Sequence, residues 1–489
     1  MEPLYYQPAH QLLEQMQRGE LSSEALTQSF LERIAAVNGS INAVIDLNEE
    51  EALDAARESD RRRAAGQAGP LEGLPMTIKD TWEVIGFGCT AGAPSLRNHR
   101  PIRDAAVIAR LRAAGAVFLG KTNVPLFASD VQTYNKLFGV TRNPHNPDRT
   151  SGGSSGGAAA GLAAGLSPLE VGSDVGGSIR TPAHFCGVFG HKPTHGLVSM
   201  RGHIPGPPGT LGQPDLAEGG PMARSARDLE LLLRVIAGPS ERGAVNWEVK
   251  LPEPEITSLK TVRFGLWLSD PQCPIDSELS ENYRAFADRL VTLGAKVSEA
   301  EHSLLDMERI LPLYFNLLGS LMSRAMSPAQ KKSMVLSAKV QPILEKLVPI
   351  TCGSLEFGVG ADQGIGDWLV KNEKRLRMRA ASDELFKDHD VIIAPISPVT
   401  AIAHDHKEPQ IARQIRVNGK KRSYSDLFCW IGLATVLGLP ATVVPLGKTR
   451  QGMPYGLQII AREGHDLTGL RVATLLEEAG LATFQKPAI

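Results

Sequence analysis

The sequence has few of the residues that mark special classes of protein. Of its 489 residues only five are cysteines, and aromatic residues make up 5%. The cysteines lie far apart, are odd in number and form no CxxC pair. This pattern excludes a disulfide framework and indicates reduced thiols, as is typical of the cytoplasm.

An excess of charge of one sign and long apolar runs are also lacking. The 52 Lys and Arg residues nearly balance the 53 Asp and Glu residues, for a net charge of −1, and they form no basic stripe of the kind that binds nucleic acid. No apolar run approaches the roughly 18 residues that a membrane span needs. The N-terminus lacks the basic and then apolar order of a secretory signal. We therefore expect a cytoplasmic protein with no nucleic-acid and no membrane partner.

Hydrophobic patterning predicts where helices and strands lie. Residues 8–65 have the spacing of successive helices, after which short apolar runs alternate with helical stretches. The predicted strands are LPMTIKD (74–80), VFLGKTN (117–123), VRFGLWL (262–268), DVIIAPISP (390–398) and ATVVPLG (441–447). This alternation is typical of an α/β protein built on a sheet.

Glycine is abundant, and one glycine-rich run stands out. Residues 150–161 read TSGGSSGGAAAG, which by composition alone resembles a flexible linker. A second Gly-Gly-Ser run follows at Gly176, Gly177 and Ser178. Repeated glycines in unlike contexts indicate that the backbone comes close to another group.

Other motif interpretations of this region are weaker. A phosphate-binding loop would need GxxxxGK[ST] directly after a strand, which the sequence lacks. GSSGG matches a nucleophile elbow centred on Ser155, but the preceding residues, RNPHNPDRT (142–150), are predicted as a loop and not as the required strand. His191 and His195 have the spacing of a zinc pair, but Pro193 lies between them and the Glu of HExxH is absent. We expect these histidines to be loop or core residues.

The order of motifs along the chain resembles the amidase signature family. The most specific match is GGSSGGAAAGLAAG followed by GSDVGGSIRTPAHFCGVFGHKPT. Upstream, GLPMTIKD, RLRAAGAVFLGKTN and GVTRNPHNP match in order and spacing, and downstream so do GPMARSARDLELLL, DVIIAPISP, LGLPATVVPLG and GMPYGLQIIA. The resemblance spans nearly the whole chain and is weakest over about 300–385.

The resemblance implies a Ser-cisSer-Lys triad. It assigns the base to Lys79, the bridging serine to Ser154, whose preceding peptide bond is cis in the family, and the nucleophile to Ser178. The chemistry is consistent, because a serine needs a base to become a nucleophile and burial lowers the pKa of a lysine. A hydroxyl at Ser154 both accepts and donates a proton, so it can relay one between the other two residues.

The second glycine run matches the family's oxyanion hole. The backbone N–H groups assigned to it belong to Val175, Gly176, Gly177 and Ser178. Glycines allow such amides to converge on a developing oxyanion, which they stabilise by hydrogen bonds. Asp174 and Arg180 match the motif as well, and we assign them to supporting hydrogen bonds.

The fold implied by the resemblance is α/β: a single large domain with a central twisted mixed β-sheet flanked by helices. We expect residues 1–70 to form an N-terminal helical segment that packs on the core and residues 71–489 to form the catalytic domain. Within the latter, about 300–385 is a helical region that lines the substrate pocket.

The implied function is that of an amidase. It would hydrolyse the C–N bond of small carboxylic or aryl or alkyl acyl amides through an acyl-enzyme on Ser178, with a small-molecule amide as its substrate and no metal or organic cofactor. Homodimers are common in the family, although no stretch of this sequence marks an interface. Apolar candidates for an acyl pocket, each equally compatible with the core, are Leu126, Phe127, Tyr134, Tyr314, Phe315 and Leu318.

Two alternatives remain open at this point. The chain could be the glutaminase subunit of a tRNA-dependent amidotransferase, which works with partner proteins. However, VPLFASDVQTYNKLFG (124–139) departs from the NMDEFAMG pattern of those glutaminases and is closer to stand-alone bacterial amidases. The chain could also be a catalytically silent, binding-only relative, although all three triad positions are intact.

Overall fold

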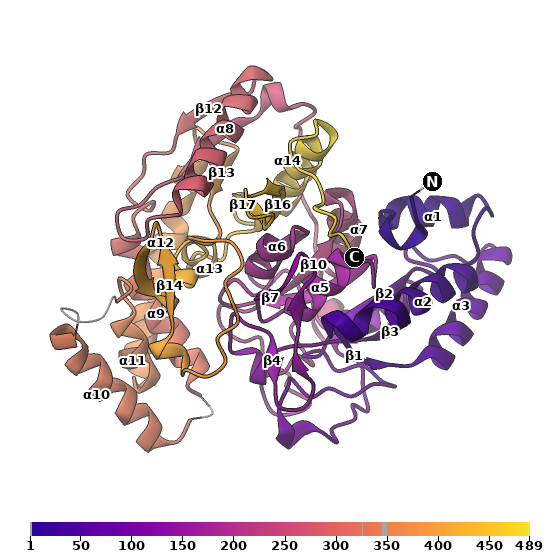
Figure 1. The fold of residues 1–489 in the computed structure, drawn as a ribbon, viewed down its shortest axis with the longest axis horizontal. Helices are drawn as coiled ribbons and strands as arrows, with labels where there is room; N and C mark the ends of the chain where they lie inside the picture. The colour runs from indigo at the N-terminus through magenta and orange to yellow at the C-terminus, as the bar shows by residue number, and fades with distance from the viewer. Residues whose placement is uncertain (1, 325, 345–349) are drawn as a thin grey trace.

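A mixed β-sheet forms the centre of the protein (Figure 1). The computed structural model describes residues 2–324, 326–344 and 350–489. Within these residues eleven strands make up the sheet. Their spatial order is β1 (Val44–Leu47), β3 (Val117–Thr122), β2 (Pro75–Lys79), β8 (Leu169–Asp174), β10 (Glu218–Ala223), β9 (Phe189–Lys192), β16 (Ala441–Lys448), β17 (Pro454–Ile460), β13 (Val391–Ala394), β11 (Arg263–Leu266) and β12 (Lys296–Glu299).

The sheet contains two groups of parallel strands, separated by antiparallel pairs. Strand β2 is parallel to both of its neighbours, β3 and β8, and β11 is parallel to both β13 and β12. The remaining pairs are antiparallel. The predicted α/β fold, with one large mixed sheet flanked by helices, is confirmed.

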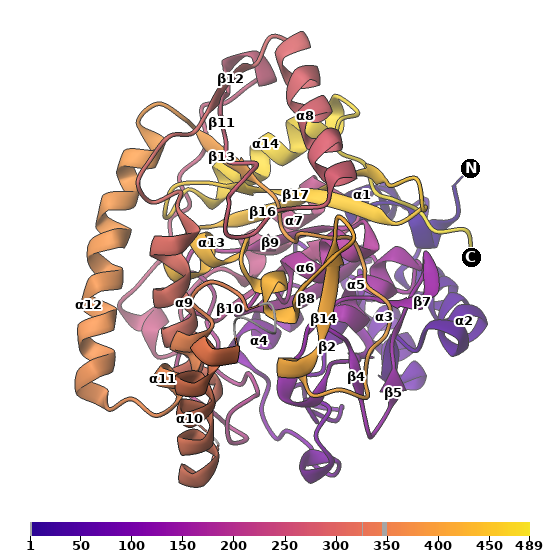
Figure 2. The same ribbon diagram turned by 60° about the vertical axis from the view of Figure 1, so that its left-hand side comes forward.

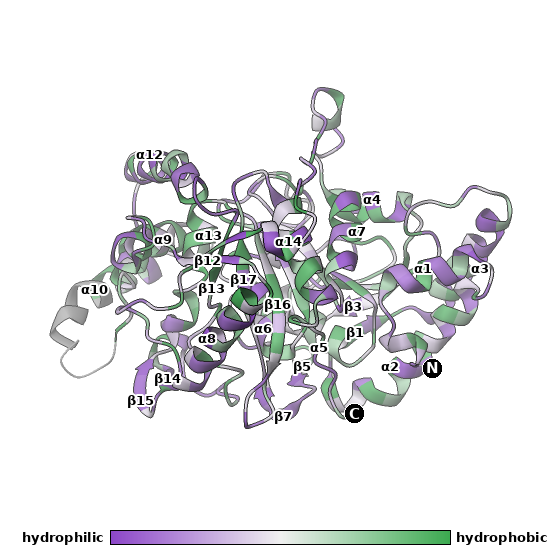
Figure 3. Cartoon of the chain, turned by 90° about the horizontal axis from the view of Figure 1, so that it is seen from above, coloured by the Kyte–Doolittle hydropathy of each residue, from purple (hydrophilic) through white to green (hydrophobic). Residues whose placement is uncertain are grey.

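Helices cover both faces of the sheet. Helices α5 (Gly156–Ala163) and α6 (Arg180–Cys186) pack on one face, and α7 (Ala226–Ile236) and α14 (Asp466–Glu478) pack on the other (Figure 3). The predicted strands are confirmed as β2, β3, β11, β13 and β16. All five residues of β2 are buried, including the polar residues Thr77 and Lys79.

Ten further helices are described. They are α1 (Ala9–Gln17), α2 (Ser23–Ile41), α3 (Glu49–Ala64), α4 (Ala106–Ala113), α8 (Ser277–Thr292), α9 (Met307–Met322), α10 (Pro328–Leu344), α11 (Leu355–Ala361), α12 (Ile365–Ala381) and α13 (Gly432–Val436). No helix in the described ranges is long and apolar enough to cross a membrane. The five cysteines are free thiols.

The N-terminal region contains the predicted helices and one element that the prediction missed. Helix α2 begins after Ser22, whose side chain accepts a hydrogen bond from the Ala25 N–H as an N-cap does. The helical prediction is wrong at β1, which pairs antiparallel with β3 at the edge of the sheet. Only the first residue of this four-residue strand is buried, so its sequence carries no clear strand pattern.

The loop prediction for residues 142–150 is also wrong. Two short strands, β6 (Arg142–Asn143) and β7 (Asn146–Thr150), form a hairpin there. The Asn143 side chain stabilises it by donating to the carbonyl oxygens of Thr150 at 3.1 Å and Phe185 at 2.9 Å. The strand went unpredicted because it lacks apolar residues and carries a proline. Two further short pairs are β4 (Tyr134–Asn135) with β5 (Gly139–Val140), and β14 (Gln414–Val417) with β15 (Lys420–Ser423).

The predicted helical region near residues 300–385 forms α9 to α12, which lie together on one side of the molecule (Figure 2). Helices α9 and α11 approach closely at two glycines. A Cβ atom on Gly360 would lie 1.9 Å from the Asn316 carbonyl oxygen, and one on Gly319 would lie 2.1 Å from the Phe357 carbonyl oxygen. These glycines therefore set the distance between the two helices.

We expect the Gly360→Ala substitution to destabilise the protein, because the added methyl group must push α11 away from α9. Overpacking of this kind costs about 1–3 kcal/mol in the free energy of unfolding. The matched control is Gly366→Ala in α12, where a Cβ atom would meet nothing within 4 Å. Denaturant unfolding of both variants checks the prediction, and equal stabilities for the two would contradict it.

Candidate active site

The site is assembled where two parallel strands end. Lys79 is the last residue of β2, and Ser173 and Asp174 are the last residues of β8. Because parallel neighbours have their carboxyl ends at the same edge of a sheet, these side chains meet there. The loops that follow lead into α5 and α6 and carry the two candidate serines.

Lys79 is completely buried and bonded to both serines nearest to it. Its Nζ lies 2.8 Å from Ser154 Oγ, 2.9 Å from Ser173 Oγ and 3.3 Å from the Ser173 carbonyl oxygen. Ser173 was not among the predicted site residues. It lies within the GSDVGGS motif, but only its position beside β2 reveals the contact.

The surroundings of Lys79 favour its neutral form. Burial lowers the pKa of Lys79 to about 7, an effect that the carboxyl groups of Asp174 and Glu170 only partly offset. A large fraction of the amine is therefore neutral near pH 7 and can accept a proton, as a base for serine must.

Glu170, although close, does not hold Lys79 in its charged form. Burial raises the pKa of the Glu170 carboxyl to about 8, against the opposing effect of its hydrogen bond with the Thr77 hydroxyl. At neutral pH this carboxyl is mostly protonated. A buried lysine beside a neutral acid keeps its lowered pKa.

Ser154 lies in the glycine-rich turn that leads into α5, and the structure contains the cis Gly153–Ser154 peptide bond that the resemblance implies. The turn is tightly packed. A Cβ atom would lie 2.6 Å from Pro182 Cα if placed on Gly152, and 2.4 Å from the Asp130 carbonyl oxygen if placed on Gly153. The whole run is buried, so it is a packed turn and not a flexible linker.

Ser178 lies beside this turn, between β8 and α6, and is partly exposed. Its carbonyl oxygen accepts a hydrogen bond from the Ser155 N–H at 3.1 Å, which ties the two serine-bearing segments together. Within the described ranges the Ser178 hydroxyl makes no hydrogen bond. The structure thus joins Lys79 directly to Ser154, and it leaves the hydroxyl of the neighbouring Ser178 open to a substrate.

Three of the four predicted oxyanion donors are free. In the described part of the chain, the N–H groups of Val175, Gly176 and Ser178 make no hydrogen bond. The Gly177 N–H, also assigned to the oxyanion hole, donates to Asp174 Oδ1 at 3.0 Å in this structure.

Asp174 and Arg180 form the fully buried ion pair that shapes the segment. Arg180 donates to Asp174 through Nε at 3.1 Å and Nη2 at 3.0 Å, and through Nη1 to Gln458 Oε1 at 3.1 Å and the Ile431 carbonyl oxygen at 3.0 Å. Burial alone raises the pKa of the Asp174 carboxyl, but the Arg180 guanidinium outweighs it and the pKa is lowered to about 2. The pair has the supporting role expected of it.

Ser155 does not have the exposed position that a nucleophile elbow requires. It is fully buried, and its hydroxyl lies 3.4 Å from the Ser173 carbonyl oxygen. Strand β7 does precede this region, contrary to our prediction, but it ends at Thr150 and not directly before the serine. The geometry does not support an elbow at Ser155.

The two histidines with zinc-like spacing bind different partners. His191 is bonded to Thr442 Oγ1 at 2.9 Å and to Asp466 Oδ1 at 3.1 Å. His195 Nδ1 lies 2.5 Å from Glu218 Oε1. Both are therefore satisfied structural residues, as expected.

Of the apolar candidates, Tyr314 lies next to the oxyanion segment. Its Oη lies 3.4 Å from the position that a Cβ atom on Gly176 would occupy, and the Phe428 ring is at 3.2 Å from the same point. Phe428 was missed because nothing in its local sequence marks it. Leu126 and Phe127 are exposed, at 47% and 39%, whereas Tyr314, Phe315 and Leu318 all belong to the core. Tyr134 Oη accepts a hydrogen bond from Arg413 Nη2 at 2.8 Å.

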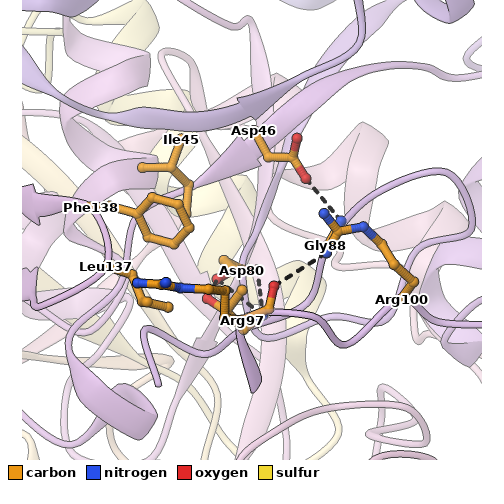
Figure 4. Close-up of a pocket in the computed structure, with 9 residues that line it drawn as sticks. Ile45, Asp46, Asp80, Gly88, Arg97, Arg100, Leu137 and Phe138 are labelled. Atoms are coloured by element: carbon orange, nitrogen blue, oxygen red, sulfur yellow. Dashed lines mark hydrogen bonds between the residues drawn. The ribbon is translucent and has the colours of Figure 1, made fainter. Parts of the chain in front are cut away.

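A cavity of about 340 Å³ lies beside the end of β2 but does not include the candidate residues (Figure 4). It borders Asp80, the residue after Lys79, whose carboxylate accepts hydrogen bonds from the Thr90 N–H and hydroxyl. Its lining residues are Ile45, Asp46, Asp80, Gly88, Thr90, Arg97, Arg100, Leu137 and Phe138. We assign this cavity no part in the chemistry of Ser178.

The sequence matches a family profile and curated proteins over most of its length. A profile of the Amidase family matches residues 25–470. A glutamyl-tRNA(Gln) amidotransferase subunit from Roseiflexus castenholzii is 35% identical over 488 residues, which cover 96% of this chain and 95% of that protein.

Solved structures are similar over the whole chain. One is the inhibitor-bound form of a vestigial protein complex, which reveals the evolutionary origins of an s-triazine catabolic enzyme. It has a TM-score of 0.77 and 30% identity and covers 98% of this chain and 100% of that one. The 6-aminohexanoate cyclic dimer hydrolase complexed with substrate has a TM-score of 0.77 and 28% identity, with 99% of each chain covered.

We expect the Arg180→Met substitution to lower the free energy of unfolding by about 3–5 kcal/mol, because it leaves the buried Asp174 carboxylate without its partner. The matched control is Arg462→Met, which breaks a half-exposed ion pair with Asp383 and costs less than about 1 kcal/mol. Denaturant unfolding measures both. A loss at position 180 no larger than that at position 462 would refute the structural role of the pair.

Proposed function

The chain belongs to the amidase signature family, and on that premise we propose that it hydrolyses amide C–N bonds through an acyl-enzyme on Ser178. One observation carries the proposal. A buried lysine with a pKa of about 7, Lys79, lies 2.8 Å from the hydroxyl of Ser154, in the turn bonded to the backbone of Ser178.

Acylation uses the three side chains in sequence. Ser178 Oγ attacks the carbonyl carbon of the amide, its proton passes to Ser154 Oγ, and the Ser154 proton passes to neutral Lys79. The negative charge that develops on the carbonyl oxygen is stabilised by the free N–H groups of Val175, Gly176 and Ser178.

Release of the amine reverses the proton path. The Lys79 ammonium returns its proton through Ser154 to the leaving nitrogen, the C–N bond breaks, and ammonia or an amine departs. Water then attacks the Ser178 ester and gives its proton to the same relay. The carboxylic acid leaves and free Ser178 is restored.

The surroundings of the oxyanion segment favour an apolar acyl group. Tyr314 and Phe428 border Gly176, and Ile431 borders Gly177. The charged residues nearby are engaged with one another, as Asp174 is with Arg180. We therefore propose small carboxylic, alkyl or aryl acyl amides as substrates, with the helical region near residues 300–385 contributing to the pocket through Tyr314.

A second candidate function is that of the glutaminase subunit of a tRNA-dependent amidotransferase. The curated relative from Roseiflexus castenholzii is named as part of such an amidotransferase, and its match spans almost the entire chain. Related proteins from Moorella thermoacetica and Thermus thermophilus carry the same name, and these names favour the second candidate over the first. The same acyl-enzyme chemistry would then release ammonia from an amide substrate for use by partner proteins.

We expect the purified protein to release ammonia or an amine from at least one simple acyl amide without ATP, tRNA or a partner protein. The Ser178→Ala substitution should lower kcat by about 10⁴-fold or more, since the nucleophile is lost. A panel of alkyl and aryl amides that includes glutamine tests this. Activity only on glutamine, and only with partner proteins present, would support the second candidate instead.

Labelling with a fluorophosphonate probe, followed by peptide mapping, identifies the nucleophilic serine without the need for a substrate. The adduct should form on Ser178, and the Ser155→Ala variant should be labelled as the native protein is. An adduct on Ser155 would restore the elbow interpretation. No adduct and no turnover would indicate a binding-only relative.

The pH dependence of kcat/KM should report the titration of Lys79. Because the base must be neutral, kcat/KM should rise about tenfold per pH unit below pH 7 and level off above it, in line with the pKa of about 7. Steady-state kinetics between pH 5 and pH 9 measure the profile. A flat profile, or an acidic limb centred near pH 4, would show that another group acts as the base.

A further inference from the structure

His203 extends the hydrogen-bonded chain of the site by one residue. Its Nε2 lies 2.9 Å from Ser173 Oγ, and the same oxygen lies 2.9 Å from Lys79 Nζ. The four side chains His203, Ser173, Lys79 and Ser154 are thus joined in a row by hydrogen bonds. The proposed reaction uses only the last two.

The fold holds His203 firmly in this place. The imidazole is 6% exposed and contacts the Trp82 ring edge-on, with 4.6 Å between the ring centroids. On the backbone, His203 forms a β-bridge with Trp82, and the Ile204 N–H donates to the Thr81 carbonyl oxygen at 2.7 Å. The loop that carries the histidine is therefore attached directly to the segment after Lys79.

The imidazole of His203 is neutral at this site. Burial lowers the pKa of His203 well below its ordinary value, and Arg324, Lys121 and, when it is protonated, Lys79 lower this pKa further. A neutral imidazole carries one proton and has one nitrogen free to accept a hydrogen bond. Nε2 can thus accept the proton of the Ser173 hydroxyl.

The direction of the hydrogen bonds follows from counting protons. A neutral lysine has two N–H bonds and one lone pair, and as a base it must point the lone pair at the Ser154 hydroxyl. Its two N–H groups then donate to the carbonyl oxygen and to Oγ of Ser173, which lie 3.3 and 2.9 Å away. Ser173 Oγ, as an acceptor from Lys79, must donate its own single proton elsewhere, and His203 Nε2 lies within reach.

We propose that His203 is a positioning residue for this reaction. By accepting the Ser173 hydroxyl proton at Nε2, it keeps the lone pair of Lys79 directed at Ser154. The inference rests on the proposed amide hydrolysis. Without this acceptor, the Ser173 hydroxyl turns towards Lys79 and donates to the lone pair that Ser154 needs, so the base is blocked although substrate binding is unchanged.

Two amide substitutions separate this role from simple packing. In His203→Gln the side-chain oxygen reaches the position of Nε2 and accepts from Ser173, whereas the shorter side chain of His203→Asn does not reach it. We expect the Asn variant to lose about 10- to 100-fold in kcat with KM unchanged, and the Gln variant to keep most of the activity. Equal losses in both variants, or wild-type kcat in the Asn variant, would overturn the proposal.

A double-mutant cycle with Ser173→Ala gives a second readout. Removal of the Ser173 hydroxyl removes the group that His203 orients, so His203→Asn should cause no further loss of kcat on that background. Additive losses would contradict the proposal. Thermal unfolding of each variant checks that it is folded, and His203→Leu, which also lacks a hydrogen-bond acceptor, replaces His203→Asn in the cycle if the Asn variant is not folded.

Labelling of Ser178 by a fluorophosphonate separates failure of this inference from failure of the proposed function. The native protein is tested first, because no labelling and no amide turnover would contradict the function itself. If the native protein is labelled, the labelling rate of His203→Asn should fall in parallel with kcat. An unchanged labelling rate would overturn the role of His203 alone.

Discussion

The complete burial of Lys79 is the constraint on which the rest of the site depends. An ammonium group removed from water and given no carboxylate partner loses its proton more readily, so burial turns an ordinary cation into a base near neutral pH. The sheet provides this burial, because β2 lies between β3 and β8 with every residue covered. The protonated state of Glu170 prevents a nearby acid from reversing the effect.

The remaining features bring serine hydroxyls and amides to that base. The glycines of residues 150–161 let the turn before α5 pack against Pro182 and Asp130, which places Ser154 beside Lys79. The buried Asp174 carboxylate binds the Gly177, Ile179 and Arg180 N–H groups and so shapes the segment around Ser178. Arg180 connects this segment to the C-terminal half through Gln458 and Ile431.

Much of the fold and the main site residues were predictable from the sequence, because buried strands and glycine-rich motifs leave strong local patterns. Strand β1 and the hairpin at β7 were missed, since an edge strand with one buried residue and an exposed hairpin have no such pattern. The contacts of Ser173 and His203 depend on which strands and loops become neighbours. The engagement of the Gly177 N–H by Asp174 likewise depends on backbone geometry that motif matching does not describe.

The most direct test of this account is a measurement of the protonation of Lys79 itself. Lysine labelled with ¹³C at Cε can be titrated by NMR between pH 5 and pH 11, with the Lys79→Met variant used to assign the resonance. We expect a midpoint near pH 7 for Lys79, while exposed lysines titrate near their ordinary value of about 10.4. A midpoint for Lys79 near that of the exposed lysines would contradict it, because the residue could not then serve as the base.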